Sequence, residues 1–276
     1  WSSDHRIHHK HVDNNDKDPY SAKMGFWYSH IGWMCREYQA HRYHDYNNVR
    51  DLQKDAIVMW QHRYYLHLTL LMNFGVPIAF GLWHGNLINS LLLVGFLRLV
   101  LNHHTTFFIN SLAHIWGKQT YTDKNSARDN GFLALLTFGE GYHNYHHIFE
   151  NDYRNGIYWW QYDPTKWLIK GASLCGLTSK LKKTPQARIE KAEATMLLKR
   201  TQQKIMHRAD NIQIAEKLQA EFDSLVANMN EYYAVKKQLL ESKRDDVVKK
   251  YEHSLLKVRY QQIKLNFELQ KRNWVQ

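Results

Sequence analysis

The chain has 276 residues, of which 18 are histidine, and its 37 lysine and arginine residues outnumber 26 acidic residues to give a formal charge of +11. With only two cysteines, Cys35 and Cys175, a disulfide scaffold and a cysteine-rich zinc or iron–sulfur site are excluded. Sixteen of the histidines lie in residues 1–147. We expect no nucleic-acid partner, because net charge alone favours one.

The first predicted element is a short helix with the pattern H-x-x-H-H, formed by His5, His8 and His9. Positions i, i+3 and i+4 lie on one face of a helix, so the three imidazoles can point toward one place. The pattern therefore predicts a metal-ligating helix.

Two apolar stretches follow, at residues 66–83 and 87–109. Residues 64–97 contain no charged side chain apart from histidine. A helix needs roughly 20 mainly apolar residues to cross a membrane, and the short link between the stretches predicts a helical hairpin. The flanks on both sides are basic and the tip is uncharged, which places both flanks in the cytoplasm. Two core helices of a soluble protein are the alternative.

Beyond the hairpin, Asn110 and His114 lie four residues apart, at the predicted cytoplasmic end of the second span. A second H-x-x-H-H pattern then follows, formed by His143, His146 and His147.

Six imidazoles from the two patterns exceed the ligands of one tetrahedral zinc ion, so the sequence predicts two metal ions. Imidazole suits iron, zinc and copper. The absence of thiolate ligands favours iron and redox chemistry.

The tail, residues 186–276, contains neither glycine nor proline, and its basic excess accounts for most of the net charge. We expect a separate helical region with coiled-coil spacing, which can dimerise or meet anionic lipid. Two seams follow that spacing: Leu218, Phe222, Leu225, Met229, Tyr232, Leu239; and Val248, Tyr251, Leu255, Val258, Gln262, Leu265, Leu269. The interruption between them predicts either a stutter or the bend of an antiparallel hairpin.

Over residues 1–170 the chain resembles the membrane-bound fatty acid desaturases of the acyl-CoA Δ9, or stearoyl-CoA, type. Five segments carry the resemblance: Asp4-His5-Arg6-Ile7-His8-His9-Lys10; Asp18-Pro19-Tyr20; Gly25-Phe26-Trp27-Tyr28-Ser29-His30-Ile31-Gly32-Trp33; Asn110-Ser111-Leu112-Ala113-His114; and Gly139-Glu140-Gly141-Tyr142-His143-Asn144-Tyr145-His146-His147 with Asp152-Tyr153-Arg154. Segments 121–127 and 159–164 look bacterial, which implies the bacterial inner membrane.

The resemblance implies an all-α integral membrane fold in residues 1–177. It also implies an O2-dependent enzyme with two iron ions that inserts a cis double bond into a saturated acyl-CoA. The implied iron ligands are His5, His8, His9, His114, His143, His146 and His147. Asn110 would hold a water at one iron, and Asp4 and Glu140 are candidates for fixing imidazole tautomers.

Substrate contacts follow from the same resemblance. Trp1 and Thr106 match positions at the kink of the family's substrate tunnel. Arg6, Lys10 and Arg36 are candidate contacts for an anionic head group. The electron donor would be a cytochrome b5-like, ferredoxin or rubredoxin partner.

The family also has an earlier H-x-x-x-x-H box and two earlier membrane helices, which these residues lack. We therefore expect an N-terminally incomplete sequence that cannot hold both irons alone. Seven further histidines of the first half are expected to be interfacial or solvated: His30, His41, His44, His62, His67, His84 and His103.

Two other functions remain open from the sequence. A related histidine-box hydroxylase of lipids or alkanes would use the same metals. A catalytically inactive membrane scaffold would use the tail to form a homo-oligomer.

Overall fold

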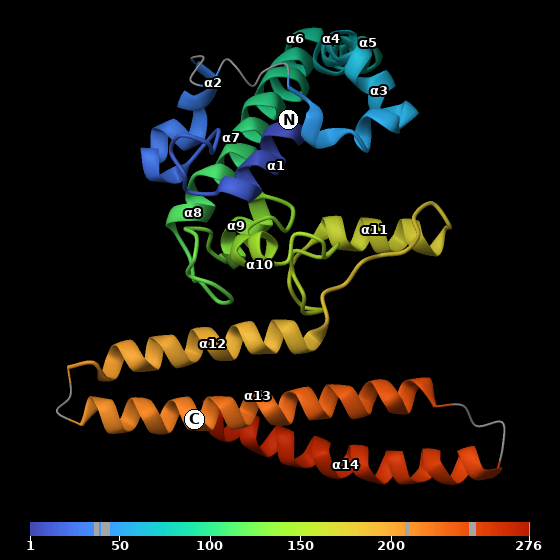
Figure 1. Ribbon diagram of the computed structural model, residues 1–276. Helices are drawn as coiled ribbons and strands as arrows, with labels where there is room; N and C mark the ends of the chain where they lie inside the picture. Colours follow the sequence, from blue (N-terminus) through green and yellow to red (C-terminus); the bar gives the residue numbers. More distant parts are fainter. Residues whose placement is uncertain (36–38, 40–44, 208–209, 243–246, 276) are drawn as a thin grey trace. The chain divides into compact units, whose positions relative to one another are not determined.

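The computed structural model describes residues 1–35, 39, 45–207, 210–242 and 247–275, with side chains omitted for 247–250 (Figure 1). Over these residues the chain is helical and contains no β-strand; isolated bridges join Lys118 to Asp129 and Asp129 to Tyr142. The predicted all-α class is confirmed. The chain divides into two compact units, Trp1–Gln119 with Asp123–Lys182, and Thr120–Thr122 with Lys183–Gln276.

The first unit begins with short elements that precede and follow residues 36–44. They are α1 (Ser2–His11), η1 (Ala22–Met24), η2 (Tyr28–Gly32), α2 (Trp33–Cys35), η4 (Asn47–Val49), η5 (Leu52–Lys54) and α3 (Ala56–Arg63). Helix α3 begins where the Asp55 carboxylate accepts the backbone N–H groups of Ile57 and Val58, at 2.9 and 3.1 Å. Such a cap satisfies donors that the first turn leaves unpaired.

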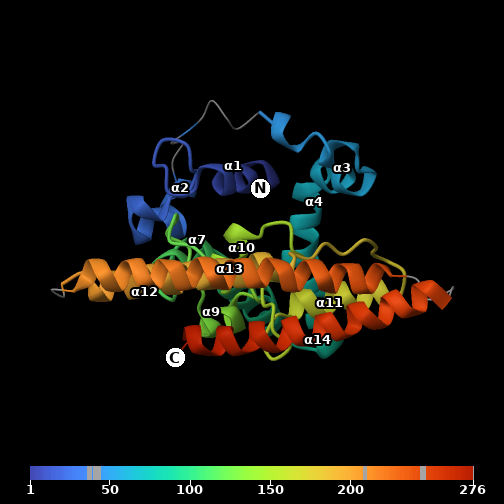
Figure 2. The ribbon, with the colours of Figure 1, turned by 60° about the horizontal axis from the view of Figure 1, so that its bottom comes forward.

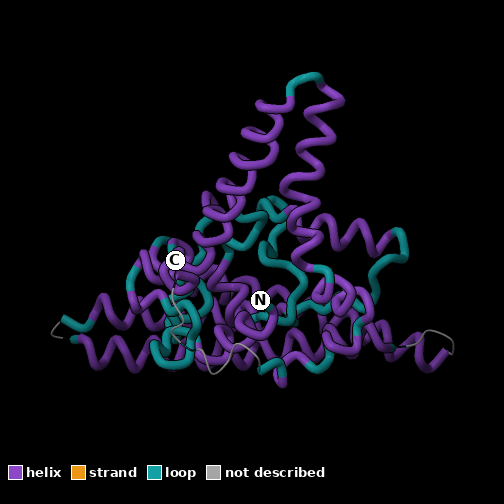
Figure 3. The backbone as a smooth tube through the Cα atoms, turned by 90° about the horizontal axis from the view of Figure 1, so that it is seen from above, coloured by secondary structure: helices purple, strands orange, loops and turns teal. Residues whose placement is uncertain are grey.

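A long helical hairpin follows (Figure 3). Its first arm is α4 (Tyr65–Leu70), η6 (Leu71–Gly75) and α5 (Val76–His84); its second is α6 (Leu87–Ser90), η7 (Leu91–Leu97), α7 (Arg98–Asn110) and α8 (Leu112–Ile115). Gly85 allows the sharp turn because its φ is +74°. The π-helical turns η6 and η7 lie within the two arms.

Small and polar residues bring the two arms together. The Ser90 hydroxyl donates to the carbonyl of Pro77 at 2.5 Å, and a Cβ added at Gly81 would lie 2.8 Å from Leu87. The Arg98 guanidinium donates to the side-chain oxygen of Asn73 at 2.6 Å. Small residues and interhelical hydrogen bonds are typical of helices that pack within a membrane.

The outer surface of the hairpin is apolar and exposed. The helices Tyr65–His84 and Leu87–Ile115 are long and apolar enough to cross a membrane, with mean hydropathy of 1.5 and 1.3. Only 11% and 6% of these windows are buried, whereas core helices of a soluble protein are mostly buried. The structure therefore favours the membrane interpretation over the soluble one.

The first unit ends with α9 (Gly131–Leu136), α10 (His143–Ile148) and α11 (Pro164–Leu174). The buried Asp163 caps α11 by accepting the Lys166 N–H at 2.9 Å. Its other oxygen accepts the N–H groups of Asn155 and Gly156, both at 2.9 Å. This carboxylate ties the start of α11 to the loop that follows α10.

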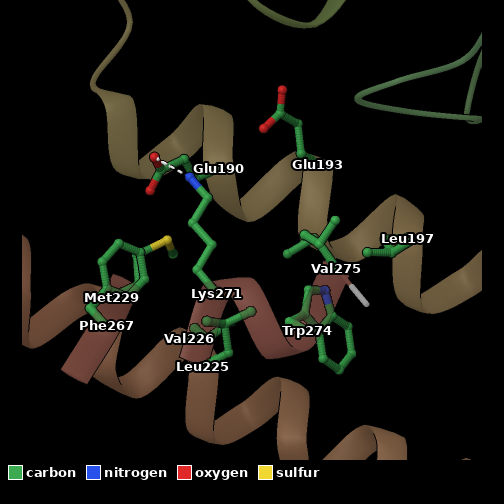
Figure 4. Close-up of a pocket in the computed structure, with 11 residues that line it drawn as sticks. Glu190, Glu193, Leu197, Leu225, Val226, Met229, Phe267, Lys271, Trp274 and Val275 are labelled. Carbon is green, nitrogen blue, oxygen red and sulfur yellow. Dashed lines mark hydrogen bonds and ion pairs between the residues drawn. The ribbon is translucent and has the colours of Figure 1, made fainter. Parts of the chain in front are cut away.

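Over its described residues, the second unit contains the long helices α12 (Gln186–Ile205), α13 (Asn211–Glu241) and α14 (Val247–Val275). Helices α13 and α14 run antiparallel side by side (Figures 1 and 2), which supports the hairpin alternative for the register break. A core of Leu225, Met229, Tyr232 and Phe267 lies between them. Figure 4 shows Lys271 of α14 paired with Glu190 of α12, at 2.8 Å, beside a small apolar pocket of about 90 Å³.

Candidate metal centre

Three helices of the first unit present the seven predicted ligands: α1 carries His5, His8 and His9; α8 carries His114; and α10 carries His143, His146 and His147. Helix α1 lies about 100 residues or more before the other two in sequence. The structure brings all seven imidazoles together in two groups.

The first group, the four-histidine cluster, consists of His8, His114, His143 and His147. Its Nε2 atoms converge: His8 to His147 at 3.3 Å, and His143 to both His147 and His114 at 3.1 Å. The second group, the three-histidine cluster, consists of His5, His9 and His146. There the Nε2 atoms of His9 and His146 lie 3.1 Å apart.

These separations fit metal coordination. Two imidazole nitrogens about 2.1 Å from one ion, at an angle of about 90–110°, lie about 3.0–3.4 Å apart. All the measured Nε2 separations fall in this range. A single cation at each cluster would therefore satisfy the converging lone pairs, and the donor sets fit two metal ions.

Helix geometry explains how each box divides. Residues i and i+4 differ by about 40° around a helix, whereas i+3 lies about 60° to the other side. In the first box the i, i+4 pair, His5 and His9, enters the three-histidine cluster. In the second box the corresponding pair, His143 and His147, enters the four-histidine cluster. Each box thus gives two ligands to one cluster and one ligand to the other.

A buried carboxylate fixes the His8 imidazole. The Asp18 Oδ1 atom accepts from His8 Nδ1 at 2.8 Å, and both side chains are almost completely buried. Asp18 is itself held by the backbone N–H groups of Asp13 and Tyr20, at 3.0 and 3.1 Å. Because the proton lies on Nδ1, the Nε2 lone pair of His8 points into the four-histidine cluster.

A hydroxyl and a second carboxylate fix His114 in the same way. The Ser126 hydroxyl donates to Asp13, so its oxygen accepts from His114 Nδ1 at 2.8 Å. The Ser126 backbone N–H also donates to Asp13, at 2.6 Å. This arrangement directs the Nε2 lone pair of His114 toward the same cluster.

Burial keeps the imidazoles neutral. Desolvation, followed by the neighbouring His146, lowers the pKa of His5 to about 3 and that of His9 to about 2. The pKa values of His143 and His147 also lie well below the ordinary value, chiefly because both are buried. Neutral imidazoles have the free lone pair that a metal ligand requires.

The three-histidine cluster lies closer to solvent and has two partly exposed glutamates near it. Glu140 Oε2 lies 4.0 Å from His146 Nε2, while Asn155 donates to its other oxygen at 2.6 Å. Glu150 lies 3.6 Å from His9 Nδ1. Glu140 therefore faces the ligating nitrogen of His146 rather than its Nδ1 atom. The half-buried Asp4 directly precedes His5 on α1, and its role stays a prediction.

Close backbone packing positions α10. A Cβ added at Gly141 would lie 2.1 Å from the backbone nitrogen of Ala134, so only glycine fits there. The Asn144 amide donates to the carbonyl of Ala127 at 2.8 Å, from a fully buried position. Both contacts set where the second box meets α1.

His30 lies near the end of the second arm, and the prediction that it is interfacial or solvated is wrong. It is buried, with Nδ1 3.0 Å from the Ser111 hydroxyl and Nε2 3.0 Å from His104 Nδ1. Packing of η2 against α7 removed it from solvent, and local spacing does not reveal a contact between segments so far apart in the chain. Asn110, half-buried at the end of α7, directly precedes Ser111. Exposed positions are found for His62, His67, His84 and His103, whereas His41 and His44 lie outside the described residues.

An open hollow of about 630 Å³ adjoins the three-histidine cluster, and Arg6 and Lys10 line it with His5, His9 and His146. Arg6 is already engaged by Asp51, through two contacts of 2.7 Å. Lys10 is the second cation of this hollow, and the carboxylate of Glu150 also lines it. Arg36, the third candidate, lies outside the described residues.

The two tunnel candidates occupy different surroundings. The Trp1 ring stacks on His5, with centroids 4.7 Å apart, and lines a pocket of about 160 Å³ with Val49, Leu52 and Val58. Thr106 is exposed on α7 and donates to the carbonyl of Asn102 at 2.9 Å. Trp1 is therefore adjacent to the three-histidine cluster, whereas Thr106 lies on the hairpin.

Sequence reasoning missed Asp18, Asp13 and Ser126. The available signal was Asp18-Pro19-Tyr20, which lies ten residues after His8 and belongs to the resemblance stated above.

Comparison with known proteins gives concordant matches. A family model described as fatty acid desaturase matches residues 1–174. The chain is 48% identical over 192 residues to a probable acyl-CoA desaturase of Schizosaccharomyces pombe, covering 69% of this chain and 40% of that protein. It is 44% identical over 206 residues to acyl-CoA desaturase 1 of Saccharomyces cerevisiae, covering 74% and 39%. An sn-2 palmitoyl-lipid 9-desaturase of Nostoc is 35% identical over 189 residues, covering 67% and 64%. The chain thus spans only part of the length of these relatives.

Proposed function

The chain belongs to the fatty acid desaturase family, and from that premise we propose that it acts as an acyl-CoA desaturase that introduces a double bond into a fatty acyl chain. The observation that carries the proposal is the convergence of seven buried or half-buried histidines into two clusters with coordination spacing. The Δ9 position and the cis geometry belong to the same proposal.

Two iron ions are the proposed cofactors. When bound, they would supply the O2-dependent redox chemistry that removes hydrogen from an unactivated C–H bond. The four-histidine and three-histidine clusters would hold one ion each, and Asn110 would approach one of them through a water. The chain's contribution is to keep the imidazoles neutral and fixed in tautomer through Asp18, Asp13 and Ser126.

The proposed acyl-CoA site lies along the hollow beside the three-histidine cluster. Lys10 there is the proposed contact for an anionic head group, with Arg6 if it exchanges Asp51 for the ligand; Arg36 stays a prediction. Trp1 offers an apolar wall next to His5. Thr106 completes the proposed tunnel. Rigid placement of the acyl chain against the metals is what selects one methylene pair over its neighbours.

The remaining partners are an electron donor, O2 and membrane lipid. The donor would be a cytochrome b5-like, ferredoxin or rubredoxin protein. The basic flanks of the apolar hairpin favour a cytoplasmic location for the histidine boxes, and the proposed bacterial inner membrane stays a prediction.

Product mass tests the proposal. A desaturase-deficient host that expresses the gene containing this chain should convert a saturated acyl group into a product two hydrogens lighter. The variant His147→Ala is the inactive control. Retention of both hydrogens with a gain of one oxygen would instead identify a hydroxylase. If neither product forms and the purified protein retains no iron, the inactive scaffold is the better explanation.

A further inference from the structure

Helix α14 carries two apolar stripes on different sides. The inward stripe packs against the core that α12 and α13 complete, and consists of Tyr260, Ile263, Phe267 and Trp274. The outward stripe is solvent-exposed, with exposed fractions of 66, 52, 62, 57 and 44% for Tyr251, Leu255, Val258, Leu265 and Leu269. At about 100° per residue, the centres of the two stripes lie about 150° apart around the helix.

The outward stripe is the second seam that the sequence predicted. Its 4-3 spacing continues through Gln262, an exposed residue between Val258 and Leu265. The first seam behaves differently, because Leu225, Met229 and Tyr232 are buried within the unit. Only the α14 seam therefore remains exposed, although it has the better heptad pattern.

We propose that this stripe pairs with the same stripe of a second copy of the chain in a parallel two-stranded coiled coil. Residues spaced four and three apart form a continuous row only against another helix that supercoils with them. In this register Leu255, Gln262 and Leu269 occupy a positions, and Tyr251, Val258 and Leu265 occupy d positions.

The borders of the stripe favour a helix over a lipid surface. One border holds Ser254, Gln261 and Glu268, and the other holds Glu252, Arg259 and Asn266. A helix that lies on anionic lipid carries lysine or arginine along both borders. Here the lysines at 257, 264 and 271 lie about 120–160° away from the centre of the stripe.

Charge and polarity also fit self-pairing. A parallel dimer brings Ser254 to Arg259 of the other copy, Gln261 to Asn266, and Glu268 to Asn273, so no like charges meet. Arg259 already pairs with Glu231 of its own chain at 3.0 Å. The two Gln262 amides would meet in one layer, and such a polar a-position layer sets register and orientation.

The size of the stripe fits a reversible dimer. From Tyr251 to Leu269 it extends about 27 Å, at 1.5 Å per residue. A surface of this length on one helix lies at the small end of specific interfaces. Anchoring both copies in one bilayer would raise their effective concentration and compensate for the small area.

Mass measurement of the full chain in detergent tests the dimer. At increasing protein concentration, light scattering corrected for detergent should approach twice the 33.1 kDa of one chain. The double variant Val258→Glu/Leu265→Glu should weaken association by at least about 100-fold, because it places charges in two apolar layers. The control Lys257→Gln/Lys264→Gln changes the net charge equally, away from the stripe, and should dimerise normally.

Disulfide trapping tests the orientation. In a background with Cys35 and Cys175 replaced by serine, Gln262→Cys and Leu269→Cys should each form an intermolecular disulfide, because parallel a positions face themselves. Lys264→Cys is the exposed control and should not. Any of three results would overturn the proposal. The wild-type chain could be monomeric, or the two stripe cysteines could be trapped no more strongly than the control. The Val258→Glu/Leu265→Glu variant could also lose binding to anionic vesicles without any change in mass.

Discussion

Asp18 offers the sharpest test of how the four-histidine cluster is held. The Asp18→Asn substitution keeps the shape but removes the charge that favours a proton on His8 Nδ1. In the native chain Asp18 accepts the backbone N–H of Asp13 at 3.0 Å. If the amide oxygen of the variant still accepts from His8, its NH2 group faces that N–H, so two donors meet. Loss of such a partner of a ligating histidine lowers metal affinity about 10- to 100-fold, or about 1.4–2.7 kcal/mol.

Competitive titration with Co2+ as a spectroscopic probe would measure the two sites of the purified full chain. We expect the affinity of one site to fall while the other, served by His5, His9 and His146, changes less than about 3-fold. Asp16→Asn, on an exposed residue of the same stretch, is the matched control. Unchanged affinity at both sites would refute the role of Asp18. An equal loss at both sites, with a lower melting temperature of the metal-free chain, would indicate a general folding defect instead.

Three further predictions concern the same clusters. The full chain should bind two metal ions, and His143→Ala and His146→Ala should each remove a different one, as measured by metal analysis; a single site in the wild type would contradict the division into two clusters. The metal-free chain should lose stability as the pH falls from about 6.5 toward 3. The folded-state pKa values of His5 and His9, about 3 and 2, lie below the unfolded value, so protons bind the unfolded state preferentially over that window. Each histidine contributes a slope of up to about 1.4 kcal/mol per pH unit, and melting curves at several pH values would reveal a flat profile if this is wrong. Gly141→Ala should reduce metal binding and lower the melting temperature, because the new Cβ would lie 2.1 Å from a backbone nitrogen; normal melting and binding would show that the loop can shift.

The sequence predicted the histidines that the structure groups into two candidate metal sites. Both histidine boxes lie on helices, as their spacing predicts, and His114 joins them despite its separation in the chain. One expectation stays a prediction. The sequence led us to expect too few ligands for both irons. The structure brings four imidazoles together in one cluster and three in the other, so metal analysis of the full chain tests whether these ligands are enough for two ions.

The hydrogen-bond partners of these histidines were harder to predict from the sequence. Loops that fold back onto the helices bring Asp18, Asp13 and Ser126 to the histidines, and such loops have no periodic pattern in the sequence. Conversely, Glu140 was expected to fix a tautomer and lies instead 4.0 Å from a ligating nitrogen. Contacts of this kind depend on how a loop returns to its helix, and local spacing carries no information about that path.

By itself, the sequence determined the features that repeat along a helix or depend on length. These are the i, i+3, i+4 histidine faces, the two apolar arms and the heptad row on α14, all of which follow from 3.6 residues per turn. Tertiary structure decided which imidazoles share a metal: the pair from the first box serves the three-histidine cluster, and the pair from the second box serves the four-histidine cluster. It also decided that the inward stripe of α14, rather than its heptad row, packs on α13. Both outcomes depend on how separate helices meet, and periodicity within one helix specifies its faces but not the partner that each face finds.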